Sequence, residues 1–146
     1  MRKMMAAGVA MVLASGEAAL AAGAPSPAAL LERFAAHFAS RDVAAQAALF
    51  QPEASFFGSS VPGLLRGQEG ARAYFQQAWG NAAPATVTCA PASLQQAAPG
   101  LVLFATTCQL QRGEQSRGLR LSGAMQQDAE GWRFANLHVS AAPAPR

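Results

Sequence analysis

The residues best suited to chemistry lie near the C-terminal end of the chain, between Asp128 and Ser140. An Asp-Ala-Glu-Gly turn is followed by residues that alternate as on a strand, so every second side chain faces the same way. One face begins with Trp132 and ends with Asn136, His138 and Ser140. A face that changes from apolar to polar is typical of a strand whose far end lines a cavity. Because imidazole titrates near neutral pH, His138 is the candidate general acid or base, oriented by Asn136 or Ser140.

The same alternation sorts the other residues of this stretch. Trp132 and Phe134 share the cavity face with His138, whereas Leu137 and Val139 face the other way. An alternative role for His138 is that of a buried, hydrogen-bonded residue that fixes the end of the strand. The sequence leaves both roles open.

Further ligand contacts are expected from the helical part of the chain and its loops. Phe34 and Tyr74 lie on apolar helix faces, and Tyr74 is able to turn its hydroxyl into a cavity. Arg66 precedes a helix, where a charged side chain lies either at a pocket rim or in solvent. Ser59 and Ser60 have no base at a recognisable spacing, so nucleophilic catalysis is not supported.

Other catalytic arrangements find little support in the sequence. The acids that follow the N-terminal leader lie at helix caps, in turns or at exposed helix positions, so no pair of carboxylates is available for acid-base work. His37 and His138 lack a third ligand, which argues against a metal site. We therefore expect no metal and no cofactor.

Cys89 and Cys108 are the only two cysteines, and we expect them to form a disulfide. A turn centred between Ala98 and Pro99 places the two residues opposite each other on antiparallel strands. Such opposed residues lie ~4.5–5.5 Å apart at Cα, within the range that a disulfide tolerates. Paired cysteines are typical of oxidising compartments.

Residues 1–21 have the pattern of a secretory signal peptide. Two basic residues precede an apolar run from Met4 to Ala14, and small residues permit cleavage after Ala21 or Ala22. The run is shorter than the ~20 residues that a membrane-spanning helix needs. We therefore expect a secreted or periplasmic protein with a linker at 22–26 and no membrane contact after cleavage.

The composition points to one domain with few charges. The 146-residue chain has a formal net charge of +3 and only 13% charged residues. The positive balance thus reflects scarce charges rather than a basic stripe, so we do not expect nucleic acid binding. The length suits a single domain, which we assign to 27–141, followed by a flexible Pro-Ala tail at 142–146.

The order of the expected elements is that of an α+β protein. Apolar spacing and capping residues predict three helices, at 27–39, directly after Asp42, and at 68–79. A short strand is expected at 54–57, and a four-stranded meander at 86–96, 101–112, 117–127 and from Gly131 onward. Apolar residues on both faces of these strands predict a homodimer formed through the sheet.

This order resembles the nuclear transport factor 2-like cone, in which three N-terminal helices pack on a curved antiparallel sheet. Within that fold the chain is similar to SnoaL-like proteins and, most closely, to the calcium/calmodulin-dependent protein kinase II association domain and its bacterial relatives. Those proteins end in a strand of the form Gly-x-Trp-x-apolar-x-His-x-His-x-Ser. Residues Gly131 to Ser140 follow this pattern with one spacer missing and with Asn136 in place of the first His.

The resemblance implies a pocket between the helices and the concave face of the sheet, and oligomers built through the sheet. The association domain also keeps an arginine in its pocket on the penultimate strand. Here that position falls near Gly123, and the nearest arginine on the strand is Arg120. Ketosteroid isomerase, which shares the fold, needs a Tyr and a carboxylate base where this chain has Phe34 and Gly58, so the resemblance excludes that chemistry.

We therefore expect a secreted or periplasmic homodimer that binds a small, largely apolar ligand or serves as an association module, without a complete catalytic set. A lyase or isomerase that uses His138 as general acid or base is the alternative. The expected ligand contacts are Phe34, Arg66, Tyr74, Arg120, Trp132, Asn136, His138 and Ser140.

Overall fold

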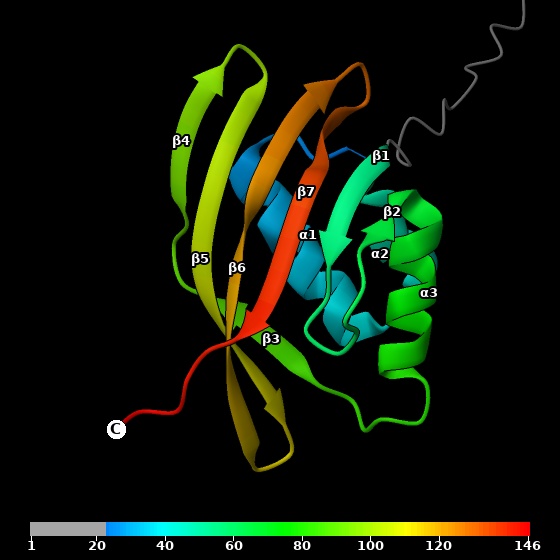
Figure 1. Cartoon of the computed structure of the whole chain (residues 1–146), viewed down its shortest axis with the longest axis vertical. Coiled ribbons are helices and arrows are strands. Elements are labelled where there is room, and N and C mark those ends of the chain that lie inside the picture. Colours follow the sequence, from blue (N-terminus) through cyan, green and yellow to red (C-terminus); the bar gives the residue numbers. More distant parts are fainter. Residues whose placement is uncertain (1–22) are drawn as a thin grey trace, which may run out of the picture.

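The structure is a computed structural model that describes residues 23–146. The signal peptide expected at 1–21 lies outside the described residues. The elements are, in chain order, α1 (Pro27–Ser40), α2 (Val43–Ala48), β1 (Phe50–Phe57), β2 (Leu65–Arg66), α3 (Gly67–Trp79), β3 (Thr86–Cys89), β4 (Ser93–Ala98), β5 (Leu101–Arg112), β6 (Gln115–Asp128) and β7 (Gly131–Ala141) (Figure 1).

Local side-chain chemistry fixes where the first two helices begin. The Ser26 hydroxyl accepts a hydrogen bond from the backbone N–H of Ala29 at 3.1 Å and caps α1. The Asp42 carboxylate accepts one from the backbone N–H of Ala45 at 2.9 Å and caps α2. The helices expected at 27–39 and 68–79 are confirmed to within one residue at each end. None of the described helices has the length and apolar character needed to span a membrane.

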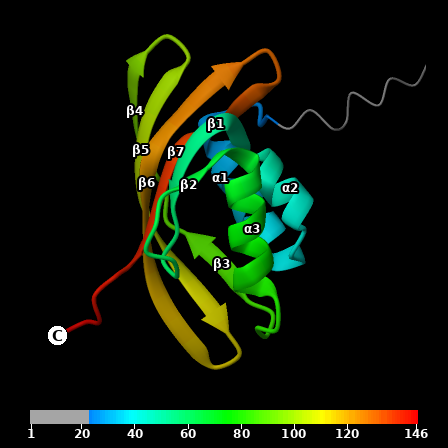
Figure 2. The same ribbon diagram turned by 45° about the vertical axis from the view of Figure 1, so that its right-hand side comes forward.

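The seven strands form one curved sheet in the order β2-β1-β7-β6-β5-β3, with β4 pairing to β5 outside this path. The expected α+β class is confirmed, and the helices cover one face of the sheet (Figure 2). The sheet is mixed rather than wholly antiparallel, because β1 runs parallel to β7. The strand expected at 86–96 is divided into β3 and β4, since Pro91 lies between them and cannot donate to a ladder.

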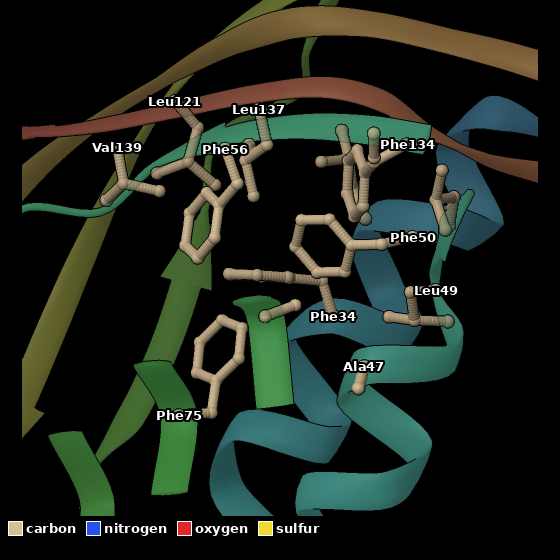
Figure 3. Close-up of a cluster of buried hydrophobic side chains, with 14 of the residues drawn as sticks. Phe34, Ala47, Leu49, Phe50, Phe56, Phe75, Leu121, Phe134, Leu137 and Val139 are labelled. Carbon is tan, nitrogen blue, oxygen red and sulfur yellow. The ribbon is translucent and has the colours of Figure 1, made fainter. Parts of the chain in front are cut away.

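A cluster of aromatic side chains occupies part of the space between the helices and the concave face of the sheet (Figure 3). Phe50, Phe56 and Phe134 are fully buried. The Phe34 ring meets Phe134 edge-on at a centroid distance of 5.9 Å and meets Phe75 at 6.1 Å. Burying one such ring contributes about 1.5–3 kcal/mol, and edge-to-face pairs add to this. These contacts hold α1 and α3 against the sheet.

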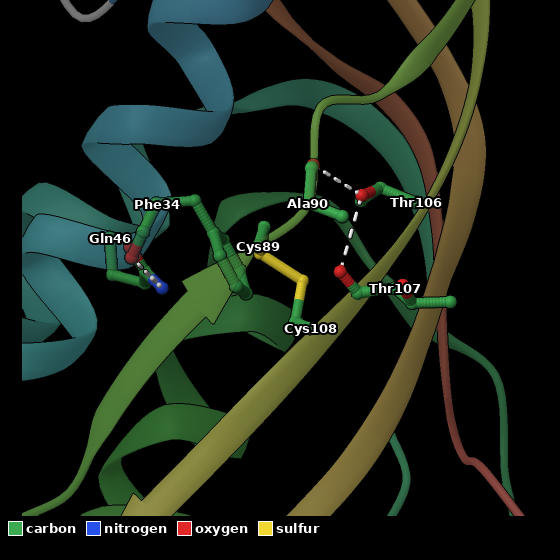
Figure 4. Close-up of a disulfide and its surroundings, with 7 residues drawn as sticks. All are labelled: Phe34, Gln46, Cys89, Ala90, Thr106, Thr107 and Cys108. Atoms are coloured by element: carbon green, nitrogen blue, oxygen red, sulfur yellow. Dashed lines mark hydrogen bonds between the residues drawn. A yellow bond between two sulfur atoms is a disulfide. The ribbon is translucent and has the colours of Figure 1, made fainter.

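The disulfide between Cys89 and Cys108 is present, as the sequence predicts (Figure 4). The two residues are directly opposed on β3 and β5, with their Cα atoms 4.0 Å apart. The strand register between the hairpin turn and the disulfide differs from the expected one. The β4–β5 hairpin pairs Ala98 with Leu101, and its register then shifts at an irregularity between Gln96 and Ala98. A further offset at the break between β3 and β4 restores the predicted pairing of the cysteines.

The break between β3 and β4 is held to β5 by hydrogen bonds. The backbone N–H of Ala90 donates to the Thr107 carbonyl at 2.9 Å. The Thr106 hydroxyl donates to the Ala90 carbonyl at 2.8 Å (Figure 4). The chain therefore stays attached to β5 before Pro91, and pairing with β5 resumes at Ser93.

Part of the expected linker at 22–26 is docked on the sheet. Ala24 is fully buried and forms an isolated antiparallel bridge with Trp132, with N–H to carbonyl distances of 2.9 and 2.8 Å. Arg33 also donates to the Gly23 carbonyl at 2.9 Å. The backbone just before α1 thus pairs with the start of β7.

The turn between β6 and β7 is fixed by an ion pair. The Arg133 guanidinium donates two hydrogen bonds to one carboxylate oxygen of Asp128, one of them from Nε at 3.0 Å. The backbone N–H of Glu130 donates to the other oxygen at 2.9 Å. Hydrogen bonding from Arg133 and, to a smaller extent, from the backbone N–H of Glu130 holds the pKa of Asp128 below its usual value. This pairing explains how the largely buried Arg133 is accommodated.

We expect the variant with both Cys89→Ala and Cys108→Ala to unfold more easily than the wild type. The bridge joins residues that are 19 apart in sequence, and the chain-entropy model gives about 3 kcal/mol for a loop of this size. Equilibrium urea unfolding measures this loss, and a reducing agent should destabilise the wild type but not the variant. Two reactive thiols in the native, unreduced wild type would contradict the prediction.

Candidate functional site

Strand β7 contains a β-bulge that decides which of its side chains reach the interior. Met125 of β6 is paired with Phe134, but the next β6 residue, Ala124, is paired with Asn136, so Ala135 has no partner. One extra residue reverses the alternation of the faces. Phe134, Leu137 and Val139 therefore share the inner face and point into the same cluster (Figure 3).

The bulge places the polar residues of β7 on the outer face of the sheet. His138 is exposed, lies opposite Ser122 of β6 and packs its ring against that of Phe57 at a centroid distance of 5.6 Å. The Asn136 side-chain amide donates to the Ser55 hydroxyl at 2.7 Å. This corrects the expectation that Asn136, His138 and Ser140 line the interior. That expectation assumed an uninterrupted alternation from Trp132 to Ser140.

The other expected ligand contacts on the sheet also lie away from the interior cavity. Arg120 is exposed and opposite Ser140 on the outer face. Arg66 is exposed on the short edge strand β2, opposite Ser55. Trp132 is half-buried at the start of β7, where its backbone bridges to Ala24. Their predicted role in ligand binding therefore has no support from their positions.

Gly123 of β6 allows the bulge to form. Its φ is 155°, and a Cβ added there would collide with the backbone carbonyl of Asn136. Only glycine permits this close approach of β6 and β7. The face reversal of β7 thus depends on the residue at position 123.

A cavity of about 640 Å³ lies between α1, α3 and the concave face of the sheet. This volume is within the range of small-molecule sites. Of the expected contacts, Phe34 and Tyr74 line it. The other apolar lining residues come from α1, α3 and the inner faces of β3, β5, β6 and β7, and are Phe38, Phe75, Ala78, Trp79, Val87, Leu110, Leu119, Leu121 and Val139.

Two aromatic residues on α3 bring polar atoms to this apolar lining. Tyr74 packs its ring over Gly58, where any added Cβ would collide with it. Trp79 is 5% exposed, and its indole Nε1 is buried without a hydrogen-bond acceptor among the described residues. A buried donor without an acceptor lowers stability, so an acceptor supplied by a bound molecule would relieve this cost.

The remaining lining residues are polar and come from two connections. Ser59 and Ser60 belong to the loop after β1. Arg112, Gln115, Ser116 and Arg117 flank the turn of the β5–β6 hairpin, which extends beyond the helices in Figures 1 and 2. In the described part of the chain, the cavity lining includes no carboxylate and no imidazole.

Arg112 and Arg117 are not among the ligand contacts expected from the sequence. A signal was present, because Arg112 follows Phe104, Cys108 and Leu110 at even spacing, and Arg117 has the same relation to Leu119 and Leu121. Residues at even spacing share one face of a strand. Among the described residues, no group of three or more His, Cys, Asp or Glu is arranged to hold a metal ion.

The fold agrees with comparisons to known proteins. Residues 28–145 match the model of the SnoaL-like domain family, and the chain belongs to that family. Comparison with curated proteins gave no match. The nuclear transport factor 2-like fold expected from the order of elements is confirmed by similar solved structures.

Three of these structures indicate the range of the fold. A Thiobacillus denitrificans protein, provisionally named a calcium/calmodulin-dependent protein kinase type II association domain, has a TM-score of 0.73 at 19% identity, covering 83% of this chain and 98% of its own. A similarly named Xanthomonas campestris protein has a TM-score of 0.69 at 16% identity, covering 81% of this chain and 86% of its own. A hexachlorocyclohexane dehydrochlorinase from Novosphingobium barchaimii has a TM-score of 0.68 at 15% identity, covering 78% of this chain and 82% of its own. At these identities the likeness concerns the fold alone.

We expect Gly123→Ala to destabilise the protein by about 3 kcal/mol, because the added methyl group forces β6 and β7 apart at the bulge. Gly63→Ala is the matched control, since a Cβ at that position meets nothing within 4 Å. Equilibrium urea unfolding of both variants measures the difference. Equal stability of the two variants would show that β7 does not adopt this bulge.

Proposed function

We propose that this protein binds a small, largely apolar molecule in the cavity between its helices and its sheet. The observation that carries the proposal is the cavity of about 640 Å³, which is lined mainly by aromatic and aliphatic side chains with polar groups at two connections. Sites of this composition recognise ligands by shape and by a few hydrogen bonds. Tyr74 and Trp79 would supply such bonds within the apolar lining.

Binding is favoured over catalysis by the chemistry of the lining. Elimination and isomerisation reactions need a group that accepts or donates a proton at the reacting carbon. Of the described residues that line the cavity, none is a carboxylate or an imidazole. A lyase or isomerase acting through His138 was the alternative from the sequence, and it loses its support because the His138 ring packs on Phe57 at the outer face. We therefore do not propose the activity of the dehydrochlorinase, which has the same fold, for this chain.

We further propose that the mature protein works in an oxidising compartment, secreted or in the periplasm. The disulfide between Cys89 and Cys108 supports this location, since such bonds persist where thiols are not kept reduced. The backbone bridge of Ala24 to Trp132 fits cleavage after Ala21 or Ala22, because every residue from Gly23 onward would be retained.

A homodimer through the outer face of the sheet remains part of the proposal. That face exposes Leu103 to 43% and Phe57 to 40%, and its neighbouring positions on β5 and β6 include the small residues Ala105 and Ser122. A second copy would cover the two exposed apolar side chains, and the exposed Arg120 and His138 of the same face would lie in or beside the interface.

The neutral fluorescent probe N-phenyl-1-naphthylamine should bind to the protein with micromolar affinity, at one site per chain. Its rings are apolar and match the aromatic lining. The variant Ala78→Trp should bind it at least about tenfold more weakly, because the larger side chain fills the cavity. Fluorescence titration measures both affinities.

His138→Ala serves as the matched control for this titration. Its side chain lies on the outer face, so probe affinity should stay within about twofold of the wild type. Loss of probe binding in His138→Ala, together with unchanged binding in Ala78→Trp, would move the binding site to the outer face.

The proposed dimer predicts that mature protein elutes at twice its chain mass at micromolar concentration. Leu103→Arg should shift it to the monomer, because a charge would then be buried in the interface. Size-exclusion chromatography with light scattering measures both masses. A wild-type monomer would contradict the dimer and leave the cavity proposal in place.

A further inference from the structure

We propose that the molecule bound in the cavity carries an anionic group on an apolar body, and that Arg117 and Arg112 receive this group at the β5–β6 hairpin. This inference rests on the proposed function and names the class of its ligand. The observations that carry it are the placement of the two arginines on the cavity side, their lack of ionic partners among the described residues, and the absence of a carboxylate from the described cavity lining.

The register of the hairpin places both arginines on one face. Arg117 of β6 lies opposite Leu110 of β5, and Arg112 lies two residues beyond Leu110. Residues two apart on a strand point to the same side, so Arg112 and Arg117 are diagonal neighbours. Leu110 lines the cavity together with both of them. The half-buried Arg112 and the exposed Arg117 therefore lie at the same open end of the cavity.

Neither arginine is neutralised within the described structure. The ion pairs of residues 23–146 involve Arg133 with Asp128 and Glu130 only. Glu114 lies between the two arginines in the turn, but forms no ion pair with either. Arg112 donates from Nε to the Ala83 carbonyl at 3.0 Å, which orients its side chain and leaves its two terminal nitrogens without a described partner.

An anion would complete this arrangement. Like charges on neighbouring positions of a strand pair are destabilising, and a shared anion converts that repulsion into two attractions. The other polar groups of the cavity lining are neutral, namely the hydroxyls of Ser59 and Ser60, the amide of Gln115, and the Ser116 hydroxyl, which donates to Gln109 Oε1 at 3.1 Å. Hydroxyl and amide N–H groups donate hydrogen bonds to anionic oxygens. The apolar lining behind them suits the rest of the molecule, so the ligand class is an amphipathic monoanion.

A pair of probes with one ring skeleton separates this inference from the proposed function. N-phenyl-1-naphthylamine is neutral, and 1-anilinonaphthalene-8-sulfonate is the same skeleton with one sulfonate. Fluorescence titration with both probes at low ionic strength compares apolar binding with apolar binding plus one negative charge. We expect the sulfonate to bind about tenfold more tightly to the wild type, as hydrogen bonds from charged donors suggest.

Arg117→Gln and Arg120→Gln form the matched pair of variants. Both remove one positive charge from β6, but Arg117 lines the cavity and Arg120 lies on the outer face. Arg117→Gln should weaken the sulfonate about tenfold and change the neutral probe by less than about twofold. Arg120→Gln should leave both affinities unchanged. Thermal unfolding of each variant checks that the fold is retained.

Each other outcome overturns a defined part of the account. Equal affinity of the wild type for the two probes, or an equal effect of Arg117→Gln and Arg120→Gln on the sulfonate, contradicts the anionic ligand but leaves apolar binding standing. Failure of the wild type to bind the neutral probe contradicts the proposed function. Sulfonate binding that persists in Ala78→Trp contradicts the location, because the sulfonate would then bind outside the cavity.

Discussion

The close approach of β6 and β7 at Gly123 is the constraint on which the interior of this protein depends. Because glycine at position 123 leaves room for the Asn136 backbone, β7 can hold Ala135 as an unpaired residue. The alternation of β7 is therefore reversed once, between Phe134 and Leu137. Its apolar residues enter the core on both sides of the bulge, and its polar residues stay on the outer face.

The aromatic cluster and the cavity divide the space under the sheet between them. Phe50, Phe56 and Phe134 are packed without exposure where β1 meets β7. Toward the β5–β6 hairpin the helices no longer cover the sheet, and the lining includes Arg112 and Arg117 (Figures 1 and 2). The disulfide holds β3, which contributes Val87 to the lining, against β5. The aromatic cluster and the cavity thus adjoin, and Phe34 and Phe75 belong to both.

Features set by local chemistry were predictable from the sequence, and features set by pairing were not. Ser26 and Asp42 are residue types that cap helices, so they indicate where α1 and α2 begin. The spacing of the two cysteines predicted the disulfide. The bulge at Ala135 requires knowledge of the partner strand, so the sequence alone placed His138 on the wrong face. The parallel pairing of β1 with β7 likewise depends on tertiary structure, because the two strands are distant in the sequence. Arg117 was detectable from its even spacing to Leu121, but the resemblance directed attention to Arg120.

A crystal structure of the mature protein soaked with N-phenyl-1-naphthylamine tests the central claim most directly. The account predicts probe density between α3 and the inner face of β6, in contact with Trp79 and Leu119. It also predicts that Leu137 and Val139 face this density while His138 faces away from it. Density on the outer face, beside Phe57 and His138, would contradict both the assigned cavity and the role given to the bulge.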